Sequence, residues 1–129
     1  EAFDSISNIN TKGRDKSSSS LLRFWKMCNP GESFSKHSGG SYFNKIKLAV
    51  NKPCNTLTAH HGSDIWHYES PRSLSIFESC LIGSYPLDYK FKNDKTGQYM
   101  IGMSVPPLMT YGVASHVYNQ LLRDNNVTT

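Results

Sequence analysis

The sequence lacks the features that mark several common functional classes. It has no run of about 18 apolar residues, the length of a membrane-spanning helix, so no membrane partner is expected. It has no G-x-G-x-x-G motif, no phosphate-binding loop and no Ser, His and Asp in an order typical of hydrolases. No catalytic centre is therefore predicted within this chain.

Cysteine is also scarce, with three residues at wide spacing, Cys28, Cys54 and Cys80. An odd number at such spacing argues against a disulfide framework and indicates a reducing compartment, so we expect a cytoplasmic protein. The chain has no signal peptide and begins with Glu1 rather than methionine. We therefore expect a processed chain or an excerpt from a longer protein.

At 129 residues, the chain is long enough to bury the core of one domain. Acidic residues are few in its front half. Residues 16–59 carry seven basic side chains and one acid, whereas the chain from residue 72 onward carries five basic and four acidic side chains. A basic segment is typical of a surface that binds a polyanion such as DNA. A solvated basic face would explain the same charge.

The residue pattern predicts a mixed α/β chain, or α+β fragment. Residues 1–20 contain few apolar side chains and end in Lys-Ser-Ser-Ser-Ser, which is typical of a linker or mobile arm. Helices are expected over residues 21–28 and 74–83. The second has a strong start signal, because Ser75 and Glu78 match a capping box.

Residues 41–59 are predicted to form strands. Apolar Ile46 and Leu48 alternate with Lys45 and Lys47, as in a strand with two unlike faces. A lysine-rich face can lie along phosphates while the apolar face packs inward. Lys45 and Lys47 are therefore candidate DNA contacts.

Histidines lie near a cysteine in the middle of the sequence. His60, His61 and His67 follow Cys54, but there is no C-x-x-C or H-x-x-x-H spacing, so no metal site is predicted. Histidines in a DNA-facing loop and plain surface histidines are the alternatives. We take His60 and His61 as candidate DNA contacts.

The stretch 98–107 reads QYMIGMSVPP and follows an expected exposed loop over residues 92–97. Gly102 permits a backbone turn or a close approach that a β-carbon would block. The Pro106-Pro107 pair suits the first turn of a helix, which is expected to continue to about Arg123. By themselves these residues predict a glycine turn before a packing helix.

Two stretches together resemble the last two motifs of the DNA cytosine-5 methyltransferases. The penultimate motif, R-x-L-T-x-R-E-C-A-R followed by G/S-F/Y-P-D-x-Y/F, is matched by Arg72, Leu74, Ser75, Glu78, Ser84, Tyr85, Pro86 and Tyr89. The final motif, Q-hydrophobic-G-N-A/S-V-P-P, is matched by Ile101, Gly102, Ser104, Val105, Pro106 and Pro107. Residues 52–58 also resemble the K-P-x-x-T-hydrophobic-T segment of the target-recognition region, and the three matches occur in the family's order.

This resemblance implies a division of the chain. Residues 1–20 would be the arm, 21–71 the target-recognition region, 72–97 the penultimate motif and loop, and 98–129 the final motif and C-terminal helix. The recognition region would be small and β-rich with short helices. The long C-terminal helix would return to a Rossmann-like methyltransferase domain.

The resemblance also implies an activity for the parent enzyme, which is transfer of a methyl group from S-adenosylmethionine to C5 of cytosine in DNA. The family's nucleophile motif and Phe-x-Gly-x-Gly cofactor loop are not in this chain. Cys54 follows Pro53, but Asn-Thr-Leu-Thr comes next, within the recognition region, so this cysteine is given no nucleophilic role. No catalytic residue is predicted, and the chain alone is expected to be inactive. The implied partners are double-stranded DNA and either the enzyme's own N-terminal catalytic half or a separate large subunit. A second copy could also bind through the C-terminal helix.

Site residues follow from the resemblance at matching positions. Thr56 and Thr58 would approach a phosphate near the target nucleotide. Arg72 would organise the recognition region and is also a candidate DNA contact. The cofactor's methionine part would lie beside the final motif, at Gly102, Met103, Ser104 and Val105.

Some positions depart from the family pattern. Met103 stands where the family has its polar Asn, Phe77 and Leu81 replace arginines, and Leu87 replaces an Asp. These departures allow an alternative function, a stand-alone or degenerate DNA-binding or regulatory module derived from a methyltransferase. Because the family's C-terminal helix returns to the catalytic domain, its apolar face is expected to be exposed here or covered by a second copy, at Met109, Val113, Val117 and Leu121.

Overall fold

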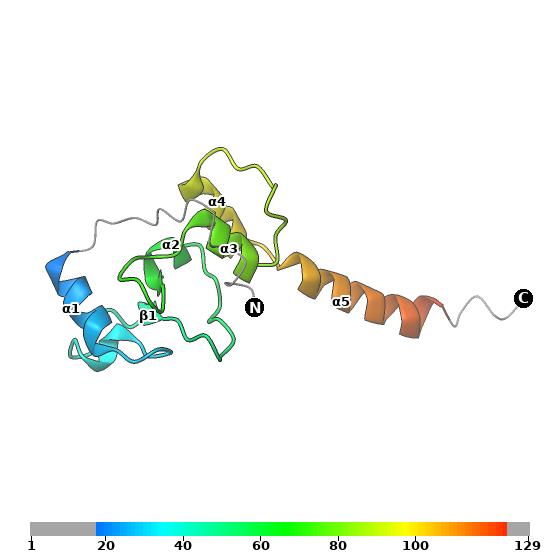
Figure 1. Ribbon diagram of the computed structural model, residues 1–129. Helices are drawn as coiled ribbons and strands as arrows, with labels where there is room; N and C mark the ends of the chain where they lie inside the picture. The colour runs from blue at the N-terminus through cyan, green and yellow to red at the C-terminus, as the bar shows by residue number, and fades with distance from the viewer. Residues whose placement is uncertain (1–17, 124–129) are drawn as a thin grey trace, which may run out of the picture.

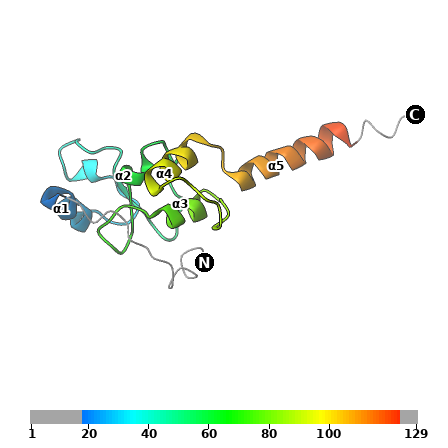
Figure 2. The ribbon, with the colours of Figure 1, turned by 90° about the horizontal axis from the view of Figure 1, so that it is seen from above.

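The computed structural model describes residues 18–123, which contain many helical and few strand residues. The elements are α1 (Ser19–Met27), η2 (Phe34–Lys36), β1 (Ile46–Lys47), α2 (His61–Asp64), β2 (Ile65–Trp66), α3 (Ile76–Ile82), α4 (Asp94–Met103), α5 (Pro107–Val117) and the single π-helical turn η3 (Tyr118–Leu122). Elements α1 to α4 form one body, and α5 projects away from it (Figures 1 and 2). The prediction of a mixed chain is confirmed.

The strand content is much smaller than expected for a β-rich region. Strands β1 and β2 form a two-stranded parallel sheet in which Ile46 pairs with Ile65 and Lys47 with Trp66. On its other side, β1 is bonded to a loop, because the Lys47 amide donates to the Glu32 carbonyl and the Lys47 carbonyl accepts from Gly31. Of the strands predicted over residues 41–59, only Ile46–Lys47 forms.

The expected alternation of faces is wrong at Lys47. This side chain was predicted to lie on an exposed lysine-rich face, but it is buried with 8% exposure. Its ammonium donates to the carbonyls of Trp25 at 3.3 Å and Cys28 at 3.1 Å, and lies 3.9 Å from the centre of the Trp25 ring. A cation is stabilised there by the partial negative charge at the C-terminal end of α1. The lysine-rich face is therefore not continuous.

Two small hydrophobic clusters form the core. One joins α1 to β2 through Cys28, Phe34 and Trp66. The other consists of Leu48, Ile65 and Leu74, with half-buried Leu57 and Ile82 packed around it. The sheet therefore links both clusters.

The predicted capping box of the second helix is confirmed. The Ser75 hydroxyl accepts from the Glu78 amide at 3.2 Å, and the Glu78 carboxylate accepts from the Ser75 amide at 2.8 Å. The same carboxylate forms a two-pronged ion pair with Arg72, with both N–O distances 2.8 Å. Glu78 is 1% exposed, so α3 begins on a buried charge that is compensated on several sides.

Helix α4 corrects the expected loop over residues 92–97. Asn93 caps it by accepting from the Thr96 amide at 2.8 Å, and Asp94 in the first turn suits the positive end of the helix. Gly102 consequently lies inside a helix and not in a turn. The close approach expected at Gly102 is confirmed, because a β-carbon there would lie 2.0 Å from the Thr58 carbonyl oxygen.

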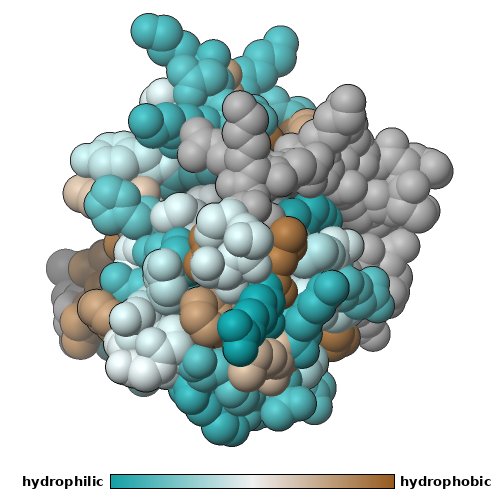
Figure 3. Space-filling model, turned by 90° about the vertical axis from the view of Figure 1, so that its left-hand side faces the viewer, coloured by the Kyte–Doolittle hydropathy of each residue, from teal (hydrophilic) through white to brown (hydrophobic). Residues whose placement is uncertain are grey.

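Helix α5 begins at Pro107, as predicted, and contacts little of the body (Figures 1 and 2). The four side chains of its predicted apolar face are exposed by 58% at Met109, 61% at Val113, 42% at Val117 and 61% at Leu121. By contrast, the side of the body that carries α1 is mainly hydrophilic, with separate apolar patches (Figure 3). The predicted exposure of the apolar face is confirmed. Among residues 18–123, no helix is long and apolar enough to span a membrane.

We predict that Gly102→Ala destabilises the chain by about 1–3 kcal/mol, the usual cost of overpacking, because the new methyl group meets main-chain atoms of residues 58 and 59. The measurement is the free energy of unfolding in urea. Gly112→Ala is the matched control, because no atom lies within 4 Å of its β-carbon position on α5. That control should be neutral or stabilising by up to about 1 kcal/mol. Equal effects of the two substitutions would contradict the close contact.

We also predict that stability declines in acid through Glu78. Burial by itself would raise the pKa of this carboxyl group, but hydrogen bonds from Arg72 and Ser75 hold the pKa below the ordinary 4.5. The unfolded chain therefore binds this proton at a higher pH than the folded chain. The stabilisation is complete above about pH 4.5 and is lost as the pH falls further.

The matched variants are Glu78→Gln and, at an exposed position, Glu69→Gln. Removal of one partner of a buried ion pair costs about 3–5 kcal/mol, so Glu78→Gln should unfold at a much lower urea concentration near pH 7. It should also lose less stability between pH 5 and 3 than the parent chain does, because it takes up about one proton fewer when it unfolds in this range. A Glu78→Gln chain as stable as the Glu69→Gln control would contradict the role of the ion pair.

Candidate functional site

An open cavity of about 860 Å³ lies where the recognition region meets the two motifs. Its lining includes Thr56 and Leu57 from the predicted recognition segment, Ile82 from α3, and Ser104, Val105 and Met109 around the start of α5. Segments that are distant in the sequence thus form one concave surface. Clefts of this size, lined mainly by apolar side chains with a few polar groups, are typical ligand sites.

The link between α4 and α5 is fixed by hydrogen bonds. The Ser104 hydroxyl donates to the Ile101 carbonyl at 2.9 Å and is also bonded to the Tyr85 hydroxyl. Ser84, in the left-handed region at a φ of 57°, accepts from the Leu108 amide at 3.1 Å. Residues of the penultimate motif therefore hold the final motif in place.

The predicted cofactor-binding residues form a surface edge and not an enclosed site. Met103 is 65% exposed and Val105 57% exposed, and the Ser104 hydroxyl already has two protein partners. Met103 offers no polar group comparable to an Asn side chain. By themselves these residues do not fit S-adenosylmethionine, because they supply apolar contacts but no uncommitted polar side chain.

The residues predicted to contact DNA are placed differently from one another. Thr56, Thr58 and His60 are exposed. Lys45 is half-buried, and its ammonium donates to the Ser63 carbonyl at 2.8 Å and lies 3.4 Å from the Asp64 carboxylate. The ammonium of Lys47 is held inside the body as described above. DNA contact by any of these residues stays a prediction.

His61 is 1% exposed, unlike its neighbour His60. Its Nδ1 lies 2.8 Å from the Thr58 carbonyl oxygen, so the ring fixes the turn before α2. Burial lowers the pKa of His61 below its ordinary 6.5, and the contact with Thr58 and the charge of Asp64 oppose this shift. The ring is therefore mainly neutral near pH 7.

Arg72 is also committed to a structural contact. Its guanidinium holds Glu78 and donates to the Ser73 carbonyl at 3.1 Å. The same carboxylate lies 3.7 Å from Nε2 of buried His67. Arg72 thus joins the segment before α3 to the first turn of that helix, and its roles in organising the recognition region and in DNA contact stay predictions.

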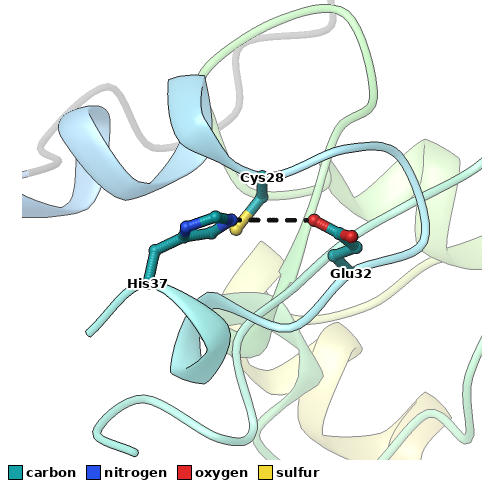
Figure 4. Close-up of side chains that lie close together, drawn as sticks. All are labelled: Cys28, Glu32 and His37. Atoms are coloured by element: carbon teal, nitrogen blue, oxygen red, sulfur yellow. Dashed lines mark ion pairs between the residues drawn. The ribbon is translucent and has the colours of Figure 1, made fainter. Parts of the chain in front are cut away.

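The structure also brings together a group of possible ligands that the sequence analysis did not identify. The side chains of Cys28, Glu32 and His37 point toward one another (Figure 4). Their ligand atoms all lie within 4.8 Å of one another. The C-x-x-x-E-x-x-x-x-H spacing matches no common metal motif, so the sequence carries no ready signal for the group. Within residues 18–123, the histidines near Cys54 form no such cluster.

No protein-family model and no solved structure matches the chain. The chain is similar to three proteins named type II methyltransferases. It is 39% identical to M.Bpa9945I of Bacillus paralicheniformis over 69 residues, 36% identical to M.XorII of Xanthomonas oryzae over 84, and 27% identical to M.AquIB of Picosynechococcus over 134.

The lengths of these relatives differ greatly from one another. The matched part is 48% of this chain but 15% of M.Bpa9945I, and 58% of this chain but 20% of M.XorII. The match to M.AquIB covers 91% of this chain and 94% of that protein. The chain therefore resembles a small part of two long methyltransferases and nearly the whole of a short one.

Proposed function

We propose that the chain is the DNA-recognition and C-terminal part of a cytosine-5 DNA methyltransferase of a restriction-modification system. The complete enzyme would transfer a methyl group from S-adenosylmethionine to C5 of cytosine in double-stranded DNA. The nucleophile and most of the cofactor site would come from a catalytic half whose motifs this sequence lacks. The chain alone would then be inactive.

One observation carries this proposal, an apolar helix that leaves the body beside an open cavity. The cavity is lined by the recognition segment and by both resembling motifs, and Met109 of α5 contributes to its lining. Exposed apolar patches of this kind mark interaction sites. A catalytic half that binds α5 would place its own residues beside this cavity.

The length of M.AquIB supports a version in which that half is a separate polypeptide. M.AquIB bears the name of a methyltransferase and is nearly covered by this chain. The long relatives support the other version, in which both halves belong to one chain. In both versions the same surfaces of residues 18–123 would meet the catalytic half.

Met103 favours the second candidate function, a DNA-binding or regulatory module without methyl transfer. This residue replaces the family's polar Asn and exposes 65% of its surface beside the cavity. Such a module would bind duplex DNA with strong salt dependence and would need no catalytic partner. The two candidates therefore differ in methyl transfer and not in DNA binding.

The test combines the chain with a catalytic half of the same enzyme, duplex DNA and labelled S-adenosylmethionine, and analyses the methylated base. We expect 5-methylcytosine only when both parts are present. Folded parts that bind DNA without any methyl transfer would favour the regulatory module. Methylation at an exocyclic nitrogen would refute the cytosine-5 assignment.

A second prediction concerns α5. The double substitution Val113→Glu and Leu121→Glu should lower methyl transfer by the combined parts at least about tenfold, because charges would be buried at the interface. Both positions are 61% exposed, so the chain's own unfolding free energy should change by less than about 0.5 kcal/mol per site. Asn119→Glu is the matched control at an exposed polar position and should keep activity. Full activity of the double variant would exclude α5 from the interface.

A further inference from the structure

We propose that Cys28, Glu32 and His37 form a zinc site that links the end of α1 to η2. This site is independent of the proposed methyltransferase function, and none of its three residues lines the cavity beside the two motifs. Sulfur, imidazole nitrogen and carboxylate oxygen are the ligand types that proteins offer to Zn²⁺. The mixed soft and borderline donors favour Zn²⁺ over Mg²⁺ or Ca²⁺, which prefer oxygen ligands.

The three ligand atoms of the group lie close together. Nε2 of His37 and Oε2 of Glu32 are 3.7 Å apart, and the Cys28 sulfur lies within 4.8 Å of both ligand atoms. Ligands at about 2.1 Å from a tetrahedral ion lie about 3.4 Å from one another. Small side-chain movements would therefore bring the three atoms around one ion, with a fourth position left for water.

An incompletely satisfied nitrogen is the second observation. Nε2 of His37 is buried and has no hydrogen-bond partner among the described residues. The carboxylate 3.7 Å away is too distant for a hydrogen bond. A metal ion here would give this nitrogen a partner, since buried polar atoms without partners are uncommon in folded proteins.

The charges of the three ligands balance a divalent cation. The Glu32 carboxylate accepts from the Asn29 amide at 3.0 Å and forms an ion pair with the Lys36 ammonium. On binding, Zn²⁺ would displace the Cys28 thiol proton to solvent, while His37 would bind through its neutral ring. One thiolate and one carboxylate would then neutralise the ion.

The position of the site suggests a structural role. Cys28 follows the last residue of α1, Glu32 lies in the next turn, and His37 follows η2. The loop between them is bonded to β1 through Gly31 and Glu32. An ion here would hold α1 and this loop against the sheet, and so would rigidify the basic part of the chain.

The test is a Co²⁺ titration of the tag-free, reduced chain, followed by displacement with Zn²⁺. We expect one equivalent of Co²⁺ to bind with a sulfur-to-cobalt charge-transfer absorption, and Zn²⁺ to remove this absorption and raise the melting temperature. Cys28→Ser should abolish the absorption. His37→Gln and Glu32→Gln should each weaken binding at least about 100-fold, beyond the usual effect of an outer-shell change.

Matched controls distinguish this site from adventitious binding. Cys54→Ser and His60→Gln remove the same ligand types elsewhere and should leave the titration unchanged. If Cys28→Ser does not fold, His37→Gln and Glu32→Gln decide the outcome. Absence of the charge-transfer band in the parent chain, or unchanged affinity in both of these variants, would overturn the proposal.

Discussion

The buried carboxylate of Glu78 is the interaction on which the arrangement of the site depends. It fixes the first turn of α3 through Ser75 and holds Arg72, the residue that leads into this helix from the recognition region. Helix α3 in turn packs against α4, and Gln98 of α4 donates to the carbonyl that precedes Ser75. Because the Glu78 charge is almost fully buried, loss of Arg72 would disturb all of these contacts.

A second contact that fixes the site is the close approach of α4 to the recognition segment. At Gly102 the helix backbone lies against Thr58, which leaves no room for a side chain. Penultimate motif, final motif and recognition segment are therefore joined by direct packing within a chain that lacks the catalytic motifs. A preassembled recognition part of this kind could bind a catalytic half without first folding on it, which would reduce the entropy cost of assembly.

Helix α5 contrasts with this packed body. It begins at a proline and is fixed there through Ser84, but its apolar side chains stay in solvent. An apolar helix that projects from a small protein is unfavourable unless a partner covers it. The proposed catalytic half would cover the exposed helix and would also close the open cavity at its base.

Local signals in the sequence were sufficient for some features. The capping box at Ser75 and Glu78 depends on residues three apart, and it was predicted correctly with its helix. The start of α5 followed from its prolines. Asn93 and Asp94 give an equally local signal for the start of α4, although a loop was predicted over residues 92–97.

Long-range contacts could not be predicted in the same way. The periodicity around Lys47 placed its side chain in solvent, whereas the carbonyls of Trp25 and Cys28 draw it inside. The close approach at Gly102 was foreseen but its partner Thr58 was not. The group of Cys28, Glu32 and His37 depends on how one turn folds back, which no residue spacing in the sequence specifies.

The central claim is that a catalytic half covers α5 and completes the cavity at its base. Amide hydrogen exchange of this chain, alone and mixed with that half on duplex DNA, tests it most directly. We predict strong new protection in residues 107–122 and slowed exchange around Thr56 and Ser104. Unchanged exchange along α5 in a mixture that actively methylates DNA would contradict the claim.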